Sequence, residues 1–278
     1  MRSTVENAQL ALLLEVASTP KPGNVDRARE YPDLRFEHFL AGAVGAREGL
    51  VALADPDRPL GTAFERAVAG MSQQSGGNTQ FGAVLLLAPL VRAVARGDSL
   101  PEGAGAVVEA TTVDDAVAFY TAFDHVDVAV DEPPADAADL DVRLGSDAEP
   151  AIRDRDLTLA DVLALSAERD GIAAEWVGGF ERTVAAAAAI ESRDGPVTDR
   201  AASAYLDLLA AEVDTFVVTQ HDRETALAVR DRAQAVTDGE EAVEAFARDL
   251  ADRGINPGTT ADLIAGGLFV ALSRGLEV

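Results

Sequence analysis

The first group of residues that could do chemistry runs from Glu15 to Asp26, and a rigid turn lies at its centre. Lys21 is the only lysine among 23 basic residues, and a proline on each side stiffens its turn. An ammonium group on a rigid loop suits a phosphate. Gly23 lets the backbone approach a ligand closely, and the two flanking carboxylates offer the oxygen ligands that Mg²⁺ prefers. A plain helix stop also fits, but the retention of one lysine favours a functional turn.

Two glycine-containing turns lead into apolar helices and form the second and third groups. The first backbone N–H groups of such helices favour an anion. The candidate ligands for an anion are Gly77, Asn78 and Thr79 in the first turn, and Asn256, Gly258 and Thr259 in the second. Asp262 follows as an acid in the first helical turn, where it could simply reach back to cap Thr259. Capping and close packing explain each turn taken alone, and neither is a P-loop because the Gly-Lys-Ser/Thr ending is missing.

The fourth group combines Asp214 and Thr215 with His221 and Asp222. Two helical turns separate Asp214 from His221, so a continuous helix would place both on one face. Histidine is the natural candidate for proton transfer near neutral pH. A lone histidine on a helix is more often structural or exposed, and both interpretations stay open.

Helices must position these groups, because helical patterns dominate the chain. Ser3 and Glu6 form a capping box before the apolar run 10–16, and Pro20 and Pro22 end that helix. Further helices are predicted at 36–54, 62–74, 79–96, 157–166, 171–190, 199–219, 224–236, 240–253 and 260–272. The segment 131–156 is rich in Asp and Pro, and we expect a long acidic surface connection with one possible short strand at Leu140–Leu144.

The fold prediction is all-α, because no series of period-2 segments could build a sheet. We expect one compact multi-helix domain over residues 1–278, since candidate site residues occur on both sides of the acidic connection.

The composition narrows the class of protein. A formal net charge of −25 repels nucleic acid, and the spread of acids along the chain indicates adaptation to high salt, where ions screen the repulsion. The absence of cysteine excludes disulfides and thiolate chemistry. The N-terminus lacks the features of a signal peptide, and the longest apolar run, 81–91, is too short for a membrane span. These features predict a cytoplasmic protein.

The four groups, taken in order, resemble the triphosphoribosyl-dephospho-CoA synthase family. The resemblance rests on Glu-Val-x-x-Thr-Pro-Lys-Pro-Gly-x-Val-Asp, Gly-Gly-Asn-Thr, Asp-Thr and Asn-Pro-Gly-Thr-Thr-Ala-Asp-Leu. The resemblance runs from Glu15 to about Leu268. Within the family, the chain is similar to an archaeal, halophile-like branch. Where the bacterial pattern has His-Lys-Gly after Asn-Thr, this chain has Gln80-Phe81-Gly82, which leaves the acceptor open.

The resemblance implies an all-α enzyme that uses ATP and Mg²⁺. C1 of the ATP ribose is attacked, adenine leaves, and the acceptor is the 2′-hydroxyl of dephospho-CoA. It implies Lys21 on phosphate, and Glu15, Asp26 and Asp214 for the metal or for stabilisation of C1. His221 or Asp262 would transfer the proton. The sequence leaves open whether the chain forms a homodimer.

Two other functions fit the sequence less well. A helical Mg²⁺-dependent nucleotide pyrophosphohydrolase would concentrate its acids as Glu-x-x-Glu pairs, and Glu240, Glu241 and Glu244 are the nearest approach. A non-catalytic nucleotide-binding helical protein would show no turnover in either the wild type or its variants.

Overall fold

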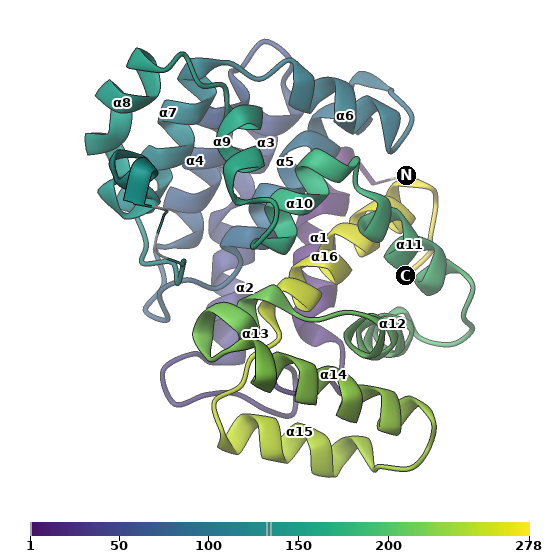
Figure 1. Cartoon of the computed structure of the whole chain (residues 1–278). Coiled ribbons are helices and arrows are strands. Elements are labelled where there is room, and N and C mark those ends of the chain that lie inside the picture. Colours follow the sequence, from purple (N-terminus) through teal and green to yellow (C-terminus); the bar gives the residue numbers. More distant parts are fainter. Residues whose placement is uncertain (1, 132, 134) are drawn as a thin grey trace.

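The computed structural model describes residues 2–131, 133 and 135–278, and helices make up the molecule throughout this part (Figure 1). These residues contain α-helices and short 3-10 helices and no β-strand, which confirms the all-α prediction. The capping box predicted at Ser3 is present: the Ser3 amide donates to Glu6 Oε2 at 2.7 Å.

The α-helices are α1 (Thr4–Ala17), α2 (Phe36–Gly45), α3 (Arg47–Ala54), α4 (Leu60–Met71), α5 (Phe81–Arg96), α6 (Glu102–Glu109), α7 (Val113–Thr121), α8 (Glu149–Asp154), α9 (Leu159–Ser166), α10 (Gly171–Gly178), α11 (Glu181–Glu191), α12 (Val197–Ala211), α13 (Thr215–Gln220), α14 (Arg223–Thr237), α15 (Val243–Asp252) and α16 (Gly258–Ser273). The 3-10 helices are η1 (Ala122–Asp124), η2 (Ala135–Leu140) and η3 (Val142–Ala148).

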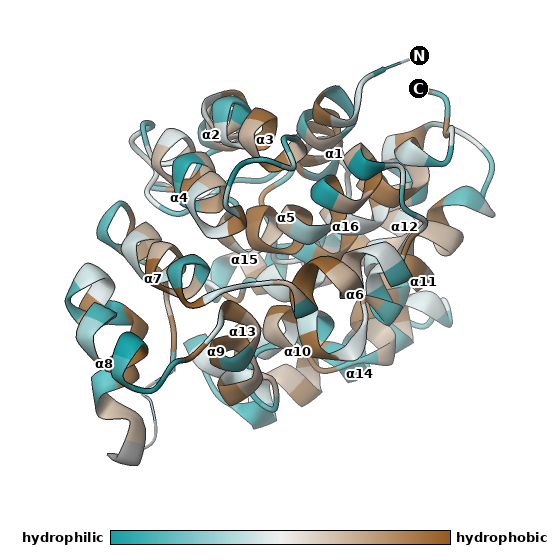
Figure 2. Ribbon diagram, turned by 90° about the horizontal axis from the view of Figure 1, so that it is seen from above, coloured by the Kyte–Doolittle hydropathy of each residue, from teal (hydrophilic) through white to brown (hydrophobic). Residues whose placement is uncertain are grey.

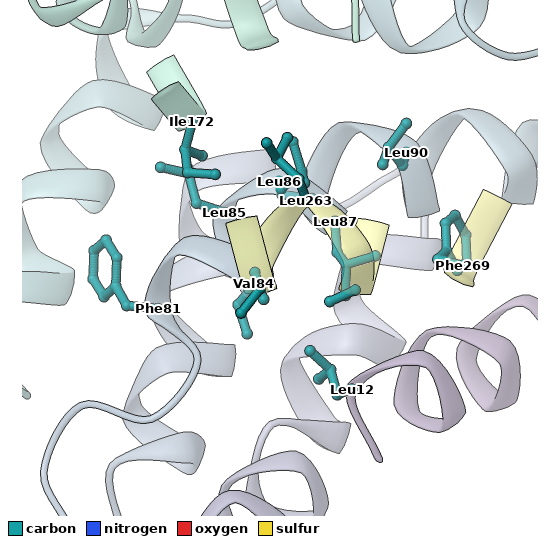
Figure 3. Close-up of a cluster of buried hydrophobic side chains, with 14 of the residues drawn as sticks. Leu12, Phe81, Val84, Leu85, Leu86, Leu87, Leu90, Ile172, Leu263 and Phe269 are labelled. Atoms are coloured by element: carbon teal, nitrogen blue, oxygen red, sulfur yellow. The ribbon is translucent and has the colours of Figure 1, made fainter. Parts of the chain in front are cut away.

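The core forms around α1, α5 and α16, which pack against one another. Both α5 and α16 are apolar nearly all round and are therefore buried on most faces. Figure 3 shows their side chains in one cluster, with Leu12 of α1 below Leu87 and Leu263. Hydrophilic residues gather on the outer helices, as Figure 2 shows for parts of α8 and α14. The N-terminal ends of α5 and α16, where two candidate turns lie, are thereby held close to the C-terminal half of α1.

Three predicted helices are each divided in two. The helix predicted at 36–54 breaks at Ala46 into α2 and α3. The helix predicted at 171–190 breaks at Gly179 and Phe180, which both take positive φ. The helix predicted at 199–219 ends at Ala211, and Asp214 caps the separate helix α13.

The segment 131–156 is wound into short helices, and residues 132 and 134 lie outside its described part. The possible strand at Leu140–Leu144 is wrong, because Leu140 ends the 3-10 helix η2 and residues 142–144 begin η3. Leu140 is buried, and its carbonyl accepts a hydrogen bond from the Tyr120 hydroxyl at 2.7 Å. The segment therefore packs against α7. Among the described residues, no helix has the length and apolar character needed to cross a bilayer.

Candidate active site

A cleft of about 750 Å³ is lined by residues of α7, α9 and η3 on one side and of α13 on the other. The N-terminal ends of α5 and α16 contribute to its lining. The predicted site residues that line it are Glu15, Asn78, Thr79, Asn256, Gly258, Thr259 and Asp262. From the turn of Lys21, only Asn24 lines it. The first, second and third motifs thus converge on one cleft, although up to 247 positions of sequence, from 15 to 262, separate their members.

Lys21 and Glu15 form a buried ion pair at the side of this cleft. The ammonium also donates to Asn24 Oδ1 at 3.0 Å, and Asn24 in turn donates to Asn256 Oδ1 at 2.8 Å. Burial raises the pKa of Glu15, and the charge of Lys21 opposes that rise. The Lys21 side chain is fully buried and points at Glu15, so in this structure it does not line the cleft as a phosphate ligand would.

Asp26 organises the turn that carries Lys21. Its Oδ2 accepts the backbone amide of Lys21 at 3.0 Å, and its Oδ1 accepts the amides of Ala28 and Arg29. Gly23 takes a φ of +79°, and a Cβ there would lie 2.4 Å from the carbonyl oxygen of Ile255. The turn therefore needs glycine to pack against the loop that precedes α16.

Asp214 joins the fourth motif to the third. Its Oδ1 caps α13 through the amide of Val217 at 3.0 Å, and its Oδ2 accepts both the amide and the hydroxyl of Thr260 at 2.7 Å. The hydroxyls of Thr215 and Thr259 lie 2.9 Å apart beside this contact. Asp214 is buried, and burial raises its pKa while the Thr260 contacts lower it.

The three carboxylates predicted to bind metal do not fit a shared Mg²⁺ site. Glu15 pairs with Lys21, and the oxygens of Asp26 and Asp214 accept protein N–H and O–H donors. No cluster of three acids or histidines suited to a metal occurs among the described residues. The sequence showed the right residue types, but it did not show that local and distant donors already use their oxygens.

Asp262 stands at the cleft surface of α16 and is partly exposed there. Gly82 faces it closely, since a Cβ on Gly82 would lie 2.1 Å from Asp262 Oδ2. Burial raises the pKa of Asp262 well above its usual range, and the nearby charges of Glu15, Asp214 and Asp170 raise it further. This carboxyl group therefore holds its proton at a higher pH than an ordinary aspartate.

His221 does not share the cleft. It is the C-cap of the short helix α13 and is exposed, and its ring nitrogen Nε2 lies 3.3 Å from the carbonyl oxygen of Gly254. Asp214 is buried against Val217 and Thr260, and neither it nor His221 belongs to the lining of the cleft. The prediction that they look into a common cleft is wrong for this reason. Gly77 also lies outside the cleft lining, at the outer side of its turn.

Sequence reasoning missed Asp170, Gln80 and Tyr31, which all line the cleft. Asp170 caps α10 through the amides of Ile172 and Ala173, both at 2.8 Å. Its side chain is open to the cleft but crowded by protein atoms, which raise its pKa by desolvation. Burial raises the pKa of Tyr31 to about 12. An N-cap pattern before Gly171 was the one signal in the sequence that could have indicated Asp170.

The cleft is strongly acidic. Its described lining holds one arginine, Arg169, and seven carboxylic acids: Glu15, Asp33, Asp127, Asp131, Asp141, Asp170 and Asp262. A bare polyanion would be repelled by such a lining, because charges of one sign in a low-dielectric cleft reinforce one another.

The helical fold and its matched sequence define the class of protein, a group-transfer enzyme. A family model for ATP:dephospho-CoA triphosphoribosyl transferase matches residues 1–277, so the chain belongs to this family. It is a transferase of the triphosphoribosyl-dephospho-CoA synthase type, as the motifs predicted.

Two relatives support the family assignment over nearly the whole chain. A protein of Lactiplantibacillus plantarum, described as a 2-(5''-triphosphoribosyl)-3'-dephosphocoenzyme-A synthase, is 28% identical over 98% of this chain and 97% of its own length. A crystal structure from Archaeoglobus fulgidus, described as a triphosphoribosyl-dephospho-CoA synthase, superposes with a TM-score of 0.70 at 28% identity. That match covers 87% of this chain and all of the other.

Proposed function

We propose that this cleft is the active site, where C1 of the ATP ribose passes from adenine to a hydroxyl of dephospho-CoA. One observation carries the proposal: Glu15, with its buried Lys21 counterion, and Asp262, with its raised pKa, line the same cleft. Two carboxyl groups whose environments differ can take different roles in a cleavage at a sugar carbon.

The reaction needs two proton movements around one carbon. The bond from C1 to adenine breaks with its electron pair on the base, and a bond from C1 to the acceptor oxygen forms. Adenine then takes up a proton, and the acceptor hydroxyl loses one. A positive charge develops at C1 between these events, and a carboxylate beside it lowers the barrier.

The residues divide these tasks as follows. Glu15 faces the developing charge at C1, and Lys21 positions it and compensates its buried charge. Asp262 gives its proton to the departing adenine, since its raised pKa keeps it protonated at higher pH. Asp170 accepts the proton of the acceptor hydroxyl, because it opens into the cleft and its Oδ1 is held by two amides.

The triphosphate binds at the α13 side of the cleft, where Asn24, Asn256 and the N-terminus of α16 present polar groups. Gly258 and Thr259 begin that helix, and on α5 the Asn78 side chain caps the helix by accepting the Phe81 amide at 3.1 Å. Seven lining acids require a cation with the triphosphate. ATP therefore enters as its magnesium complex, with the phosphates as the main ligands of the ion.

We further propose a cytoplasm of high ionic strength as the working environment, because the chain carries a large net negative charge. A chain of charge −25 is stabilised when salt screens its self-repulsion. We expect the midpoint of thermal unfolding to fall as KCl is lowered from about molar to 0.1 M, a range over which the Debye length grows about threefold. An unchanged midpoint would contradict adaptation to salt.

The products of ATP turnover test the proposed function. With ATP, Mg²⁺ and dephospho-CoA at high salt, the wild type should release adenine and form a triphosphoribosyl adduct detectable by mass spectrometry. Glu15→Gln and Asp262→Asn should each slow adenine release by on the order of 10²-fold. Release of AMP and pyrophosphate would instead indicate hydrolysis. The acids considered for that reaction, Glu241 and Glu244, form ion pairs with Arg232 and Arg29. No turnover at all would favour a binding protein.

A further inference from the structure

We propose that Gln80 and Thr79 bind the ribose hydroxyls of the ATP donor and make the enzyme selective for ribose over deoxyribose. This inference rests on the proposed function, because it assigns one part of the same cleft to one part of the donor. It concerns two side-chain oxygens that the catalytic steps above leave unused.

Gln80 carries a buried oxygen with no partner. Only 2% of the residue is exposed, and it lines the cleft. Its Nε2 donates to the carbonyl oxygen of Leu12 at 3.2 Å. A carbonyl can only face the NH₂ end of the amide, so this contact fixes the orientation of the side chain. The Oε1 atom then has no hydrogen-bond partner among the described residues.

Thr79 places a second such oxygen beside the first. Its Oγ1 is buried and likewise has no partner in the described part of the chain, and the residue also lines the cleft. Both oxygens border the same glycine of α2: a Cβ on Gly42 would lie 2.6 Å from Thr79 Oγ1 and 3.5 Å from Gln80 Oε1. Two adjacent buried oxygens without partners are costly in a native protein and indicate a ligand that satisfies them.

The location fits the sugar of the donor. Gln80 is anchored to Leu12, which lies three residues before Glu15 on α1 and therefore on the same face of that helix. Glu15 is the carboxylate that faces C1 in the proposed function. The 2′-hydroxyl is bonded to the carbon next to C1, so a ribose with C1 at Glu15 brings its hydroxyls toward Gln80.

The chemistry of the two oxygens selects the ligand. An amide oxygen is an acceptor only, so it repels phosphate oxygens and requires an O–H or N–H donor. A threonine hydroxyl can accept or donate. The pair therefore suits the neighbouring 2′- and 3′-hydroxyls of ribose, which can each donate to one protein oxygen. A deoxyribose donor would leave one buried oxygen unsatisfied, and such a site discriminates strongly.

The experiment compares donors in the wild type and in variants. We would measure kcat/KM for adenine release from ATP, 2′-deoxy-ATP and 3′-deoxy-ATP, with Mg²⁺ and dephospho-CoA at high salt. For each enzyme, kcat/KM for ATP is divided by kcat/KM for the deoxy donor, and this ratio is compared with the wild-type ratio. The comparison cancels the different intrinsic reactivity of the deoxy sugars. Gln80→Met should lower the preference for ATP by on the order of 10-fold to 100-fold, and Thr79→Val should lower it for one of the two deoxy donors.

Three controls separate binding from structure. Thr79→Ser keeps the hydroxyl and should keep the wild-type ratio. Gln220→Met also changes a cleft glutamine, but on α13, and should leave the ratio unchanged. Thr79→Val should not lower the midpoint of thermal unfolding, because its Oγ1 has no partner in the described protein, whereas a purely structural hydroxyl would cost stability on removal.

The outcomes are distinguishable from those of the proposed function. Adenine release from ATP with an unaltered donor ratio in Gln80→Met would overturn this inference and leave the proposed function standing. If the wild type releases no adenine from ATP, both fail together. A lower ratio in Gln80→Met with normal thermal unfolding would support the ribose site.

Discussion

Two pairs of carboxylates at or beside the cleft differ in the partners of their oxygens. Asp26 and Asp214 have both oxygens occupied by protein N–H or O–H donors. Glu15 and Asp262 line the cleft. All four belong to motifs of similar appearance in the sequence. The comparison teaches that the saturation of hydrogen bonds, more than membership of a motif, separates an acid that holds the fold together from one that is available to a substrate.

The largest expected effect comes from breaking the ion pair between Lys21 and Glu15, one of the two carboxylates that line the cleft. Lys21→Met leaves the buried Glu15 charge without its counterion. Removal of one partner of a buried pair costs about 3–5 kcal/mol, so the free energy of unfolding measured with urea should fall by about that amount. The double variant Lys21→Met/Glu15→Gln removes the charge as well and should recover much of the stability without recovering adenine release. If the double variant is as unstable as the single one, the stability lost in Lys21→Met does not come from the unpaired charge of Glu15.

Asp214 tests the other side of the comparison. Asp214→Asn places an amide NH₂ near donors from Thr260 and Val217, so at least one buried hydrogen bond is lost. The expected loss of unfolding free energy is about 2–3 kcal/mol. The rate of adenine release per folded molecule should change less than in Asp262→Asn. A variant that keeps its stability and loses its turnover would instead place Asp214 with the acids that face the substrate.

The sequence could not show which acids have their oxygens occupied by protein donors and which line the cleft, because this depends on contacts between residues far apart in the chain. The capping box at Ser3 and the apolar helices α5 and α16 follow from local patterns and were predicted. The partner of Asp214, Thr260, is 46 residues away along the chain, and only the packing of α13 against α16 brings them together. The helix predicted through 199–219 hid this contact, since its real end at Ala211 frees Asp214 to act as a cap.

The inward direction of Lys21 was equally hidden. Its neighbours along the chain include Glu15, so an ion pair could have been weighed, but burial of that pair depends on the loop before α16. That loop closes over the turn where Gly23 meets the carbonyl oxygen of Ile255. Asp170 escaped notice because a lone N-cap aspartate looks the same whether its helix borders solvent or a cleft. Convergence of the motifs was predictable, but the direction of each side chain was not.

Asp262 should give a smaller effect that depends on pH. Its pKa is raised in the folded protein by burial and by neighbouring acids, so the folded state binds its proton more tightly than the unfolded state does. The stability that this group contributes is present below the ordinary aspartate pKa of about 4 and is lost as the pH rises through the folded-state pKa. Asp262→Asn abolishes this loss. Urea unfolding at constant KCl should therefore show the variant gaining stability relative to the wild type as the pH rises above about 4.

The raised pKa of Asp262 is contradicted if the difference in unfolding free energy between wild type and Asp262→Asn does not vary with pH. A constant difference would mean that Asp262 titrates alike in the folded and unfolded states, and it would then have no reason to hold a proton for adenine. The corresponding change in Asp214→Asn should be dominated by lost hydrogen bonds, because Thr260 and Val217 donate to its ionised form.

The smallest expected effect concerns His221, which follows Asp214 by seven positions in the sequence but lies away from the cleft. It is exposed at the C-terminal end of α13, and its ring meets the backbone carbonyl of Gly254. Exposed substitutions of this kind change stability by about 0.5 kcal/mol or less. His221→Ala should therefore change the unfolding free energy by no more than about 0.5 kcal/mol and keep the rate of adenine release within about a factor of two of the wild type. A large loss of turnover with unchanged stability would return proton transfer to this residue. It would also mean that α13 moves when substrate binds, because only such a movement could bring the ring into the cleft.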